Sequence, residues 1–155
     1  MNVLFSDRDI VVAIKPVGLD SETEFPNALI EQLGGSLFPI HRLDKNVGGV
    51  MVYARTKNAA ADLSRAVQSG EMVKEYLALV HGNAPAEGDW EDLLWKDSTK
   101  NKVFVVKKER KGVKKARLEF VRLKENLVRI RLHTGRSHQI RVQFASRGFP
   151  LVGDH

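Results

Sequence analysis

The sequence has no cysteine among its 155 residues, so it can form neither disulfide bonds nor thiolate metal sites. Long apolar runs are also missing. The longest, such as residues 10–14, suit a strand, whereas a membrane-spanning helix needs about 20 apolar residues. Asp7, Arg8 and Asp9 interrupt the start of the chain, which argues against a secretory signal peptide there. We therefore expect a cytoplasmic protein with no membrane association.

The length and composition predict one globular domain over residues 1–155. The sequence is 43% hydrophobic, and a chain of this size buries roughly 68–70% of the surface that it exposes when unfolded. That is enough for a hydrophobic core without disulfides or metals. We find no internal repeat, low-complexity tract or linker.

Charge is distributed unevenly along the chain. Residues 1–95 contain 8 Lys/Arg against 14 Asp/Glu, whereas residues 96–155 contain 17 against 5. Residues 96–117 alone contain ten Lys/Arg with only Asp97 and Glu109 opposing them. Such a basic segment predicts a polyanionic partner, first of all nucleic acid, although a solvated basic hairpin remains the alternative. Since Phe104 is the one aromatic residue within the lysine cluster, we expect contacts to the backbone of the nucleic acid rather than base stacking.

The hydrophobic pattern predicts an α+β fold. Alternating or continuous apolar residues predict several short strands, and segments with helical spacing predict only three helices, without strict strand–helix alternation. Thr56 is a candidate N-cap for the second helix and Ser137 for the third. The expected strands are 3–5, 9–15, 50–54, 72–80, 116–123 and 127–133, with more strand in 90–108, and the helices are 27–33, 57–69 and a segment after residue 137.

Two polar segments gather chemically capable residues. In the first, residues 41–45, Asp44 lies between Arg42 and Lys45, whose charges favour an ionised carboxylate able to act as a nucleophile or a base. From local sequence alone, an aspartate satisfied by turn amides is the favoured interpretation, because aspartate is common in turns. In the second, residues 134–141, Arg136 and Arg141 flank an expected helix start, a position that suits a phosphate or a carboxylate. A solvated arginine on a helix surface is the alternative there.

A tyrosine and three histidines each allow a structural or a functional interpretation. Tyr76 lies in an expected strand, where an aromatic ring is either part of the core or a cover for one face of a nucleobase. His41, His133 and His138 match no common metal-ligand spacing and lack a second carboxylate. We therefore expect no metal site.

Together, these segments resemble the RluA-type family of RNA pseudouridine synthases. The resemblance extends over essentially the whole chain and rests on the order and spacing of several motifs, which makes it more specific than any one of them. The motifs are Ile14-Lys15-Pro16-Val17-Gly18-Leu19, the residues 41–44 (His-Arg-Leu-Asp), 74–82 (Lys-Glu-Tyr-Leu-Ala-Leu-Val-His-Gly), 134–141 (Thr-Gly-Arg-Ser-His-Gln-Ile-Arg) and 153–154 (Gly-Asp).

The resemblance implies an isomerase that converts a uridine of structured ribosomal or transfer RNA to pseudouridine without a cofactor. It implies a pseudouridine synthase fold with a bent, mainly antiparallel but mixed sheet and flanking helices. By the same resemblance, Asp44 is the catalytic carboxylate, Tyr76 stacks on the target base and handles protons, and Arg141 pairs with Asp44. Arg42 would fill the space that the extruded base leaves. Further RNA contacts are expected from Lys107, Lys108, Lys114, Lys115, Arg136 and His138.

Two departures from the family pattern keep alternatives open. The family usually follows its aspartate motif with Thr-Ser-Gly, whereas this chain has Val47-Gly48-Gly49, and the family domain is longer at its C-terminal end. An exposed sheet edge or patch would follow from the shorter chain, and the oligomeric state is open. A non-catalytic RNA-binding or RNA-folding module on the same scaffold is therefore the second hypothesis. A nucleoside or glycoside hydrolase is the third, with Asp154 as its second carboxylate.

Overall fold

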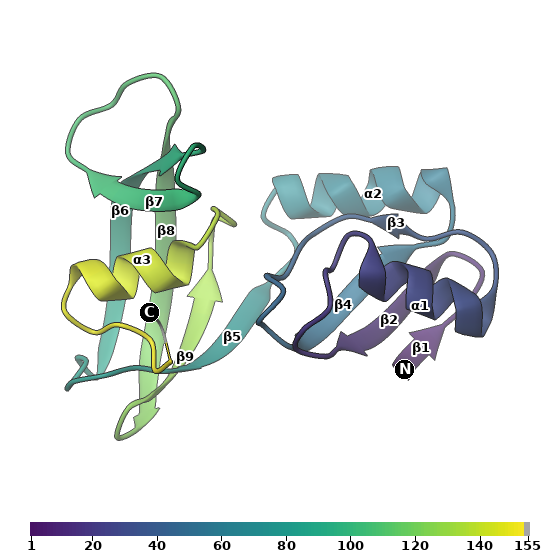
Figure 1. Cartoon of the computed structure of the whole chain (residues 1–155), viewed down its shortest axis with the longest axis horizontal. Helices are drawn as coiled ribbons and strands as arrows, with labels where there is room; N and C mark the ends of the chain where they lie inside the picture. Colours follow the sequence, from purple (N-terminus) through teal and green to yellow (C-terminus); the bar gives the residue numbers. More distant parts are fainter. Residues whose placement is uncertain (154–155) are drawn as a thin grey trace. The chain divides into compact units, whose positions relative to one another are not determined.

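The computed structural model describes residues 1–153 and divides into two compact units, Met1–Met72 and the residues from Val73 onward (Figure 1). Helices and strands are mixed within each unit, so the predicted α+β class is confirmed. Every strand pairing within residues 1–153 is antiparallel, and the strands form two sheets, one in each unit. That both units fold as one domain stays a prediction.

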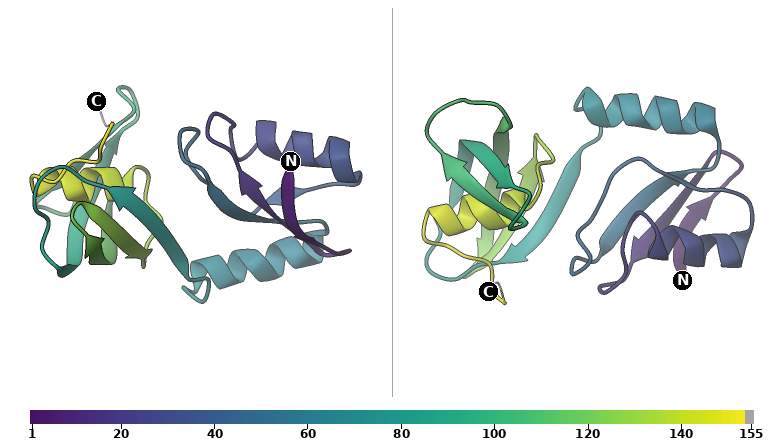
Figure 2. Two further views of the ribbon diagram at one scale, coloured as in Figure 1. Left: turned by 90° about the horizontal axis from the view of Figure 1, so that it is seen from below. Right: turned by 45° about the horizontal axis from the view of Figure 1, so that its top comes forward.

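The first unit is a four-stranded sheet with two helices. Its strand order is β1-β2-β4-β3, and Figure 2 shows α1 and α2 on opposite sides of the sheet. The Thr56 hydroxyl accepts a hydrogen bond from the Ala59 N–H at 3.1 Å, which confirms the predicted N-cap of α2. The elements are β1 (Asn2–Ser6), β2 (Ile10–Lys15), α1 (Glu24–Leu33), β3 (Phe38–Pro39), β4 (Gly49–Ala54) and α2 (Lys57–Gln68).

The core of the first unit follows from strand alternation. Val11, Ala13 and Lys15 of β2 are buried at every second position, and Val11 and Ala13 pair with Tyr53 and Met51 of β4. Phe25 and Leu29 of α1 join the same cluster and are fully buried. The buried face of β2 thus ends on a lysine, Lys15, where an apolar residue would continue the pattern.

The second unit is a five-stranded sheet with one helix across it (Figure 1). The strand order is β5-β9-β8-β6-β7. The β8–β9 hairpin turns at Glu125 and Asn126 as the sequence predicts. The elements are β5 (Lys74–Leu79), β6 (Glu87–Asp97), β7 (Lys102–Val106), β8 (Val113–Lys124), β9 (Leu127–Leu132) and α3 (Gln139–Ser146).

Helix α3 is attached to its sheet by apolar and polar contacts. Phe144 packs edge-on against Phe120 and Trp90, with ring centroids 5.2 and 4.7 Å apart. The Asp92 carboxylate accepts hydrogen bonds from Arg147 Nη1 at 2.6 Å and from the amide of the buried Gln143 at 2.9 Å. Hydrogen bonds and burial together therefore fix the helix on which the second polar segment ends.

Two predicted helix starts differ from the structure. Helix α1 begins at Glu24 rather than at residue 27, because Pro26 lies in the first turn, where no amide hydrogen is needed for the helix. Ser137 is not the cap of α3. His138 precedes that helix in the left-handed conformation, with φ of 52°, and no side chain caps it.

Candidate functional site

The buried side chain of Lys15 forms hydrogen bonds with the loop that contains Asp44. The buried ammonium donates hydrogen bonds to the carbonyl oxygens of Pro16 at 2.9 Å, Leu19 at 2.8 Å and Lys45 at 3.4 Å. Burial lowers the pKa of Lys15, while the charges of Asp20 and Asp44 oppose that shift. A single cation thus ties residues 16–19 to the residue that follows Asp44.

Backbone contacts complete this tie. The Gly18 N–H donates to the Lys45 carbonyl at 2.7 Å, and Gly18 has φ of 101°, a conformation that favours glycine. The Val47 N–H donates to the Asp44 carbonyl at 2.9 Å and closes a turn after the aspartate. Gly48 leaves room for this arrangement, since a Cβ there would lie 3.2 Å from the Lys15 carbonyl.

The residues before Asp44 are anchored on the core. The Leu43 N–H donates to the hydroxyl of the buried Ser21 at 3.1 Å, and Leu43 packs against the apolar cluster of the first unit. The Tyr53 hydroxyl donates to the Ser21 carbonyl, and burial raises the pKa of Tyr53 well above its usual value. His41 Nε2 accepts the Val52 N–H at 3.1 Å. Asp44 itself is exposed, so the loop presents a solvent-accessible carboxylate on a firmly held backbone.

The charges around Asp44 also form ion pairs with α1 and the segment before it. Lys45 Nζ lies 3.0 Å from Glu24 Oε1, and Arg42 Nη1 lies 3.6 Å from Glu22 Oε1. Both pairs are exposed, and exposed ion pairs contribute at most about 1 kcal/mol to stability. Arg42 is therefore available at low cost for an anionic partner.

In the second unit, Tyr76 lies on the face of β5 that packs against the core. It is half-buried beside the apolar cluster, and Lys74 occupies the same face two residues earlier. Burial lowers the pKa of Lys74, and the nearby charge of Arg136 lowers it further. A Cβ at Gly135 would lie 2.7 Å from Lys74 Nζ, so glycine gives this ammonium its space.

The second polar segment is organised by the buried Gln139. Its Oε1 accepts hydrogen bonds from the Thr134 hydroxyl at 2.8 Å and the Arg136 N–H at 3.0 Å. Its amide nitrogen donates to the Arg117 carbonyl at 3.1 Å, which fixes the segment to β8. His138, the residue before Gln139, has a left-handed backbone conformation. The exposed Arg141 lies in the first turn of α3.

The predicted RNA-binding residues of the second unit lie on β8, after β7 and just before α3. Arg136 Nε donates to the Lys115 carbonyl at 2.7 Å, which brings these two predicted residues together. Lys107 and Lys108 follow β7, and Lys114 and Lys115 lie on opposite faces of β8. All four lysines are exposed.

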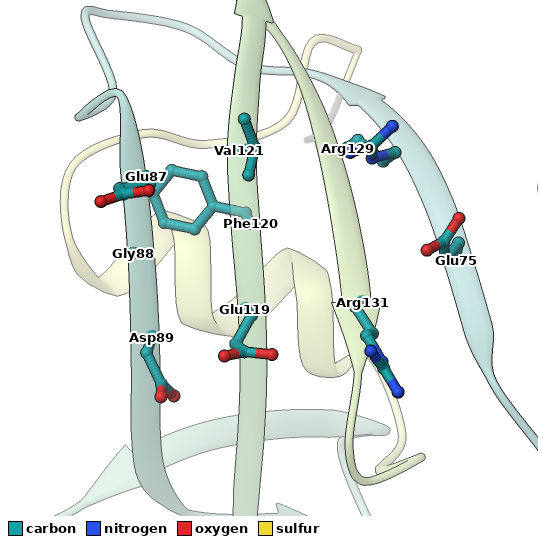
Figure 3. A pocket seen from close by; sticks show the side chains of 9 residues that line it. All are labelled: Glu75, Glu87, Gly88, Asp89, Glu119, Phe120, Val121, Arg129 and Arg131. Atoms are coloured by element: carbon teal, nitrogen blue, oxygen red, sulfur yellow. The ribbon is translucent and has the colours of Figure 1, made fainter. Parts of the chain in front are cut away.

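A groove of about 660 Å³ lies elsewhere on this unit, on the face of the sheet away from α3 (Figure 3). Four carboxylates and two guanidiniums line it, so its net charge disfavours an RNA backbone. It contains none of the predicted site residues. Its lining residues are Glu75, Glu87, Gly88, Asp89, Glu119, Phe120, Val121, Arg129 and Arg131.

Within residues 1–153, no group of three or more His, Asp or Glu side chains is placed to hold a metal ion. None of the helices described there has the length and apolar character needed to cross a bilayer.

Comparison with known proteins identifies the family. The model of the RNA pseudouridylate synthase family matches residues 9–146, which include both polar segments and β5. The chain belongs to this family. The resemblance to RluA-type synthases that the motifs predict is thereby confirmed.

Named relatives of this chain support the family assignment. It is 35% identical over 176 residues to an uncharacterized RNA pseudouridine synthase of Aquifex aeolicus, covering 99% of this chain and 55% of the relative. It is 33% identical to ribosomal large subunit pseudouridine synthase D of Yersinia pestis, covering 99% and 51%. The chain therefore spans about half the length of the curated relatives that it matches.

Solved structures give the same fold. The human RNA pseudouridylate synthase domain containing 4 superposes with a TM-score of 0.82 at 27% identity, covering 99% of this chain and 67% of that one. The human RNA pseudouridylate synthase domain containing 1 superposes with a TM-score of 0.86 at 24% identity, with the same coverage. The predicted pseudouridine synthase fold is confirmed.

The three predicted catalytic residues are divided between the units. Asp44 belongs to the first unit, and Tyr76 and Arg141 belong to the second. Their joint role, including the pairing of Asp44 with Arg141, stays a prediction. The same holds for RNA binding by Arg42, Arg136, His138 and the four lysines.

The structural roles of three residues, Lys15, Gln139 and Trp95, were not predicted from the sequence. Lys15 could have been found, because it continues the buried alternation of Val11 and Ala13. Gln139 stands inside a recognised motif, but only its burial shows that it organises the segment. Trp95 lies just outside the lysine cluster in sequence and pairs directly with Phe104, so an aromatic pair lies beside this cluster.

Proposed function

We propose that this chain carries the catalytic core of an RNA pseudouridine synthase that isomerises a uridine in structured ribosomal or transfer RNA. The match of the family model over residues 9–146 is the observation that carries this proposal. The firmly held loop under Asp44 supports it, because a catalytic carboxylate must keep its position through the reaction. A cytoplasmic location is part of the same proposal.

The reaction needs only groups that the polypeptide can supply. The bond between uracil N1 and ribose C1′ breaks, the base rotates, and a bond forms between C5 and C1′. The proton on C5 is lost and N1 ends with a proton, so atoms and electrons balance without an oxidant, a reductant or a cofactor. Asp44 would attack C1′ or act as a base on the sugar, and the proposal includes either step.

The other predicted residues would assist this chemistry. Tyr76 would stack on the target base and move the proton between C5 and N1. Arg141 would keep Asp44 ionised. A uridine within a helix must first be flipped out, which costs a few kcal/mol, and Arg42 would occupy the vacated space.

The basic surface of the second unit would supply binding energy to offset base flipping. The exposed lysines at 107, 108, 114 and 115, with Arg136 and His138, would contact phosphates. These contacts do not depend on base identity, so they would position the RNA without selecting its sequence.

The experiment incubates the chain with ribosomal and transfer RNA from cells that lack the protein and maps pseudouridine by chemical labelling. The wild type should convert one or a few uridines, and Asp44→Asn should convert none while it still binds RNA. Conversion by both proteins would exclude Asp44 as the catalytic carboxylate. No conversion by the wild type would contradict the activity of this chain.

The residues Val47-Gly48-Gly49 favour a second candidate, a non-catalytic RNA-binding module. They replace the two hydroxyl side chains that the family pattern places after the aspartate, and a Cβ at Gly48 would lie 3.2 Å from the Lys15 carbonyl. This candidate predicts identical behaviour of wild type and Asp44→Asn in every RNA-dependent assay. A hydrolase would instead release free uracil. Its predicted second carboxylate, Asp154, lies outside the described residues.

A further inference from the structure

Two aromatic side chains stack on each other in the β6–β7 hairpin, near its turn at residues 98–101. Trp95 of β6 and Phe104 of β7 are directly opposed across the strands, with ring centroids 6.2 Å apart and planes inclined by 26°. Phe104 is 42% exposed, whereas Trp95 is half-buried. The outer ring of the stack is therefore open to solvent.

The loop after β7 packs on the inner ring of this stack. The Arg110 guanidinium lies over the Trp95 ring, 4.6 Å from its centroid. A Cβ at Gly112 would lie 3.7 Å from Trp95 Cδ1, so the loop backbone passes close to the indole. Because these contacts fix Trp95, they also fix the plane on which Phe104 rests.

Cations surround the stack on the same face of the sheet. Lys102 lies two residues before Phe104 on β7, and Lys115 lies two residues after Val113, the partner of Trp95 on β8. Lys102, Lys115 and Arg110 are all exposed. An exposed ring with flanking cations is the arrangement that binds one unpaired base and its neighbouring phosphates.

A purely structural role explains less of this arrangement. A cross-strand aromatic pair stabilises a hairpin, but that role does not require the outer ring to stay exposed or cations to gather around it. We infer that the exposed face of Phe104 binds an unpaired RNA base, with Lys102, Arg110 and Lys115 contacting the phosphates beside it. This inference rests on the proposed function for its choice of RNA as the partner.

The test compares two single-stranded 12-mers of equal charge, one of uridine nucleotides and one of abasic ribose phosphates. Phe104→Leu should weaken binding of the uridine oligomer by about 5- to 100-fold, because one stacked base is lost. Its affinity for the abasic oligomer should change less than about twofold, since phosphate contacts remain. Phe104→Tyr, which keeps an aromatic ring, should bind both oligomers as the wild type does.

Val105→Ala is the matched control. Val105 is the next residue of β7, is 37% exposed and faces the other side of the sheet, so its loss should affect neither oligomer. An equal loss on both oligomers in Phe104→Leu would assign the residue to hairpin structure and overturn the inference. No loss on either oligomer would overturn it as well.

Pseudouridine formation by the wild type is measured beside these affinities. Formation of pseudouridine with no base-dependent effect at Phe104 would remove the stacking site and leave the proposed function standing. A base-dependent effect without pseudouridine formation would leave the stacking site standing and contradict the proposed function.

Discussion

The Asp44 loop of the first unit and the basic segment of the second unit are built in opposite ways. Backbone groups of the Asp44 loop bond to a buried ammonium, a buried hydroxyl and a glycine amide, so its main chain has little freedom. The basic segment instead places its lysines on exposed strand and loop positions. Chemistry on a single ribose needs a fixed carboxylate, whereas binding a polyanion needs accessible charge. Under the proposed function, the first region would hold the catalytic carboxylate and the second would attach the RNA.

Among the changes predicted here, removing the buried Lys15 ammonium should have the largest effect on stability and turnover. Lys15→Met leaves the Pro16, Leu19 and Lys45 carbonyls without their shared donor, which should reduce the free energy of unfolding by about 2–3 kcal/mol. A shift of about 1 Å in Asp44 should lower turnover about 100-fold. Urea unfolding and single-turnover kinetics measure both effects.

Lys57→Met is the control for that substitution, since Lys57 is exposed at the start of α2. It should change neither stability nor turnover measurably. Turnover within about twofold of the wild type in Lys15→Met would show that the tie beneath the loop does not position Asp44.

Neutralising the exposed lysines should have an intermediate effect confined to RNA binding. With about five phosphate contacts, the logarithm of affinity should fall with the logarithm of salt concentration at a slope near −3.5. Glutamine at positions 107, 108, 114 and 115 should make that slope less steep by about 0.7 for each lysine that contacts a phosphate. Titrations at several salt concentrations measure the slope.

Glutamine at positions 8 and 57, two exposed cations of the first unit, gives a control with a smaller change in charge. Its slope should stay close to that of the wild type. Equal changes per charge removed in the two variants would show that RNA attachment is not concentrated in the second unit.

The smallest effect is expected at the polar attachment of α3. Burial opposes ionisation of Asp92, but hydrogen bonds from Arg147 and Gln143 outweigh it and lower the pKa below the usual value of 3.8. Asp92→Asn should therefore reduce the free energy of unfolding by about 1–3 kcal/mol at pH 7. Turnover should fall only as far as the fraction of folded protein falls.

The sign of the pH dependence follows from that lowered pKa. The stabilisation by ionised Asp92 is fully present above pH 3.8 and is lost as the pH falls through the lower pKa of the folded state. Urea unfolding should show a gap between wild type and Asp92→Asn at pH 7 that narrows below pH 3.8. Glu91→Gln, on the adjacent exposed position, should show no such gap.

Short-range sequence patterns predict much of this fold, because single strands, hairpins and helix caps depend on neighbouring residues. Alternating or continuous apolar residues locate β2, β4, β5 and the β8–β9 hairpin, and the Thr56 cap follows from a single residue type. The division of the strands into two sheets depends on long-range pairing, which periodicity does not encode. The start of α1 was missed because a proline can lie inside a first helical turn as well as before one.

The residues of the candidate site can be predicted from the sequence more readily than the contacts that hold them in place. Asp44, Tyr76 and Arg141 stand in motifs that can be read from the sequence. The three carbonyls around Lys15 and the pairing of Trp95 with Phe104 depend on how the backbone folds back on itself. Trp95 lies opposite Phe104 only because of the register of the β6–β7 hairpin, which cannot be read from the sequence.

The most direct test of the division between chemistry and attachment measures two quantities on one RNA, the dissociation constant and the single-turnover rate at saturating protein. Asp44→Asn should abolish the rate and keep the dissociation constant within about twofold of the wild type. The variant with glutamine at positions 107, 108, 114 and 115 should bind more weakly and keep the saturated rate. Loss of both quantities in each variant, or pseudouridine formation by Asp44→Asn, would contradict the account.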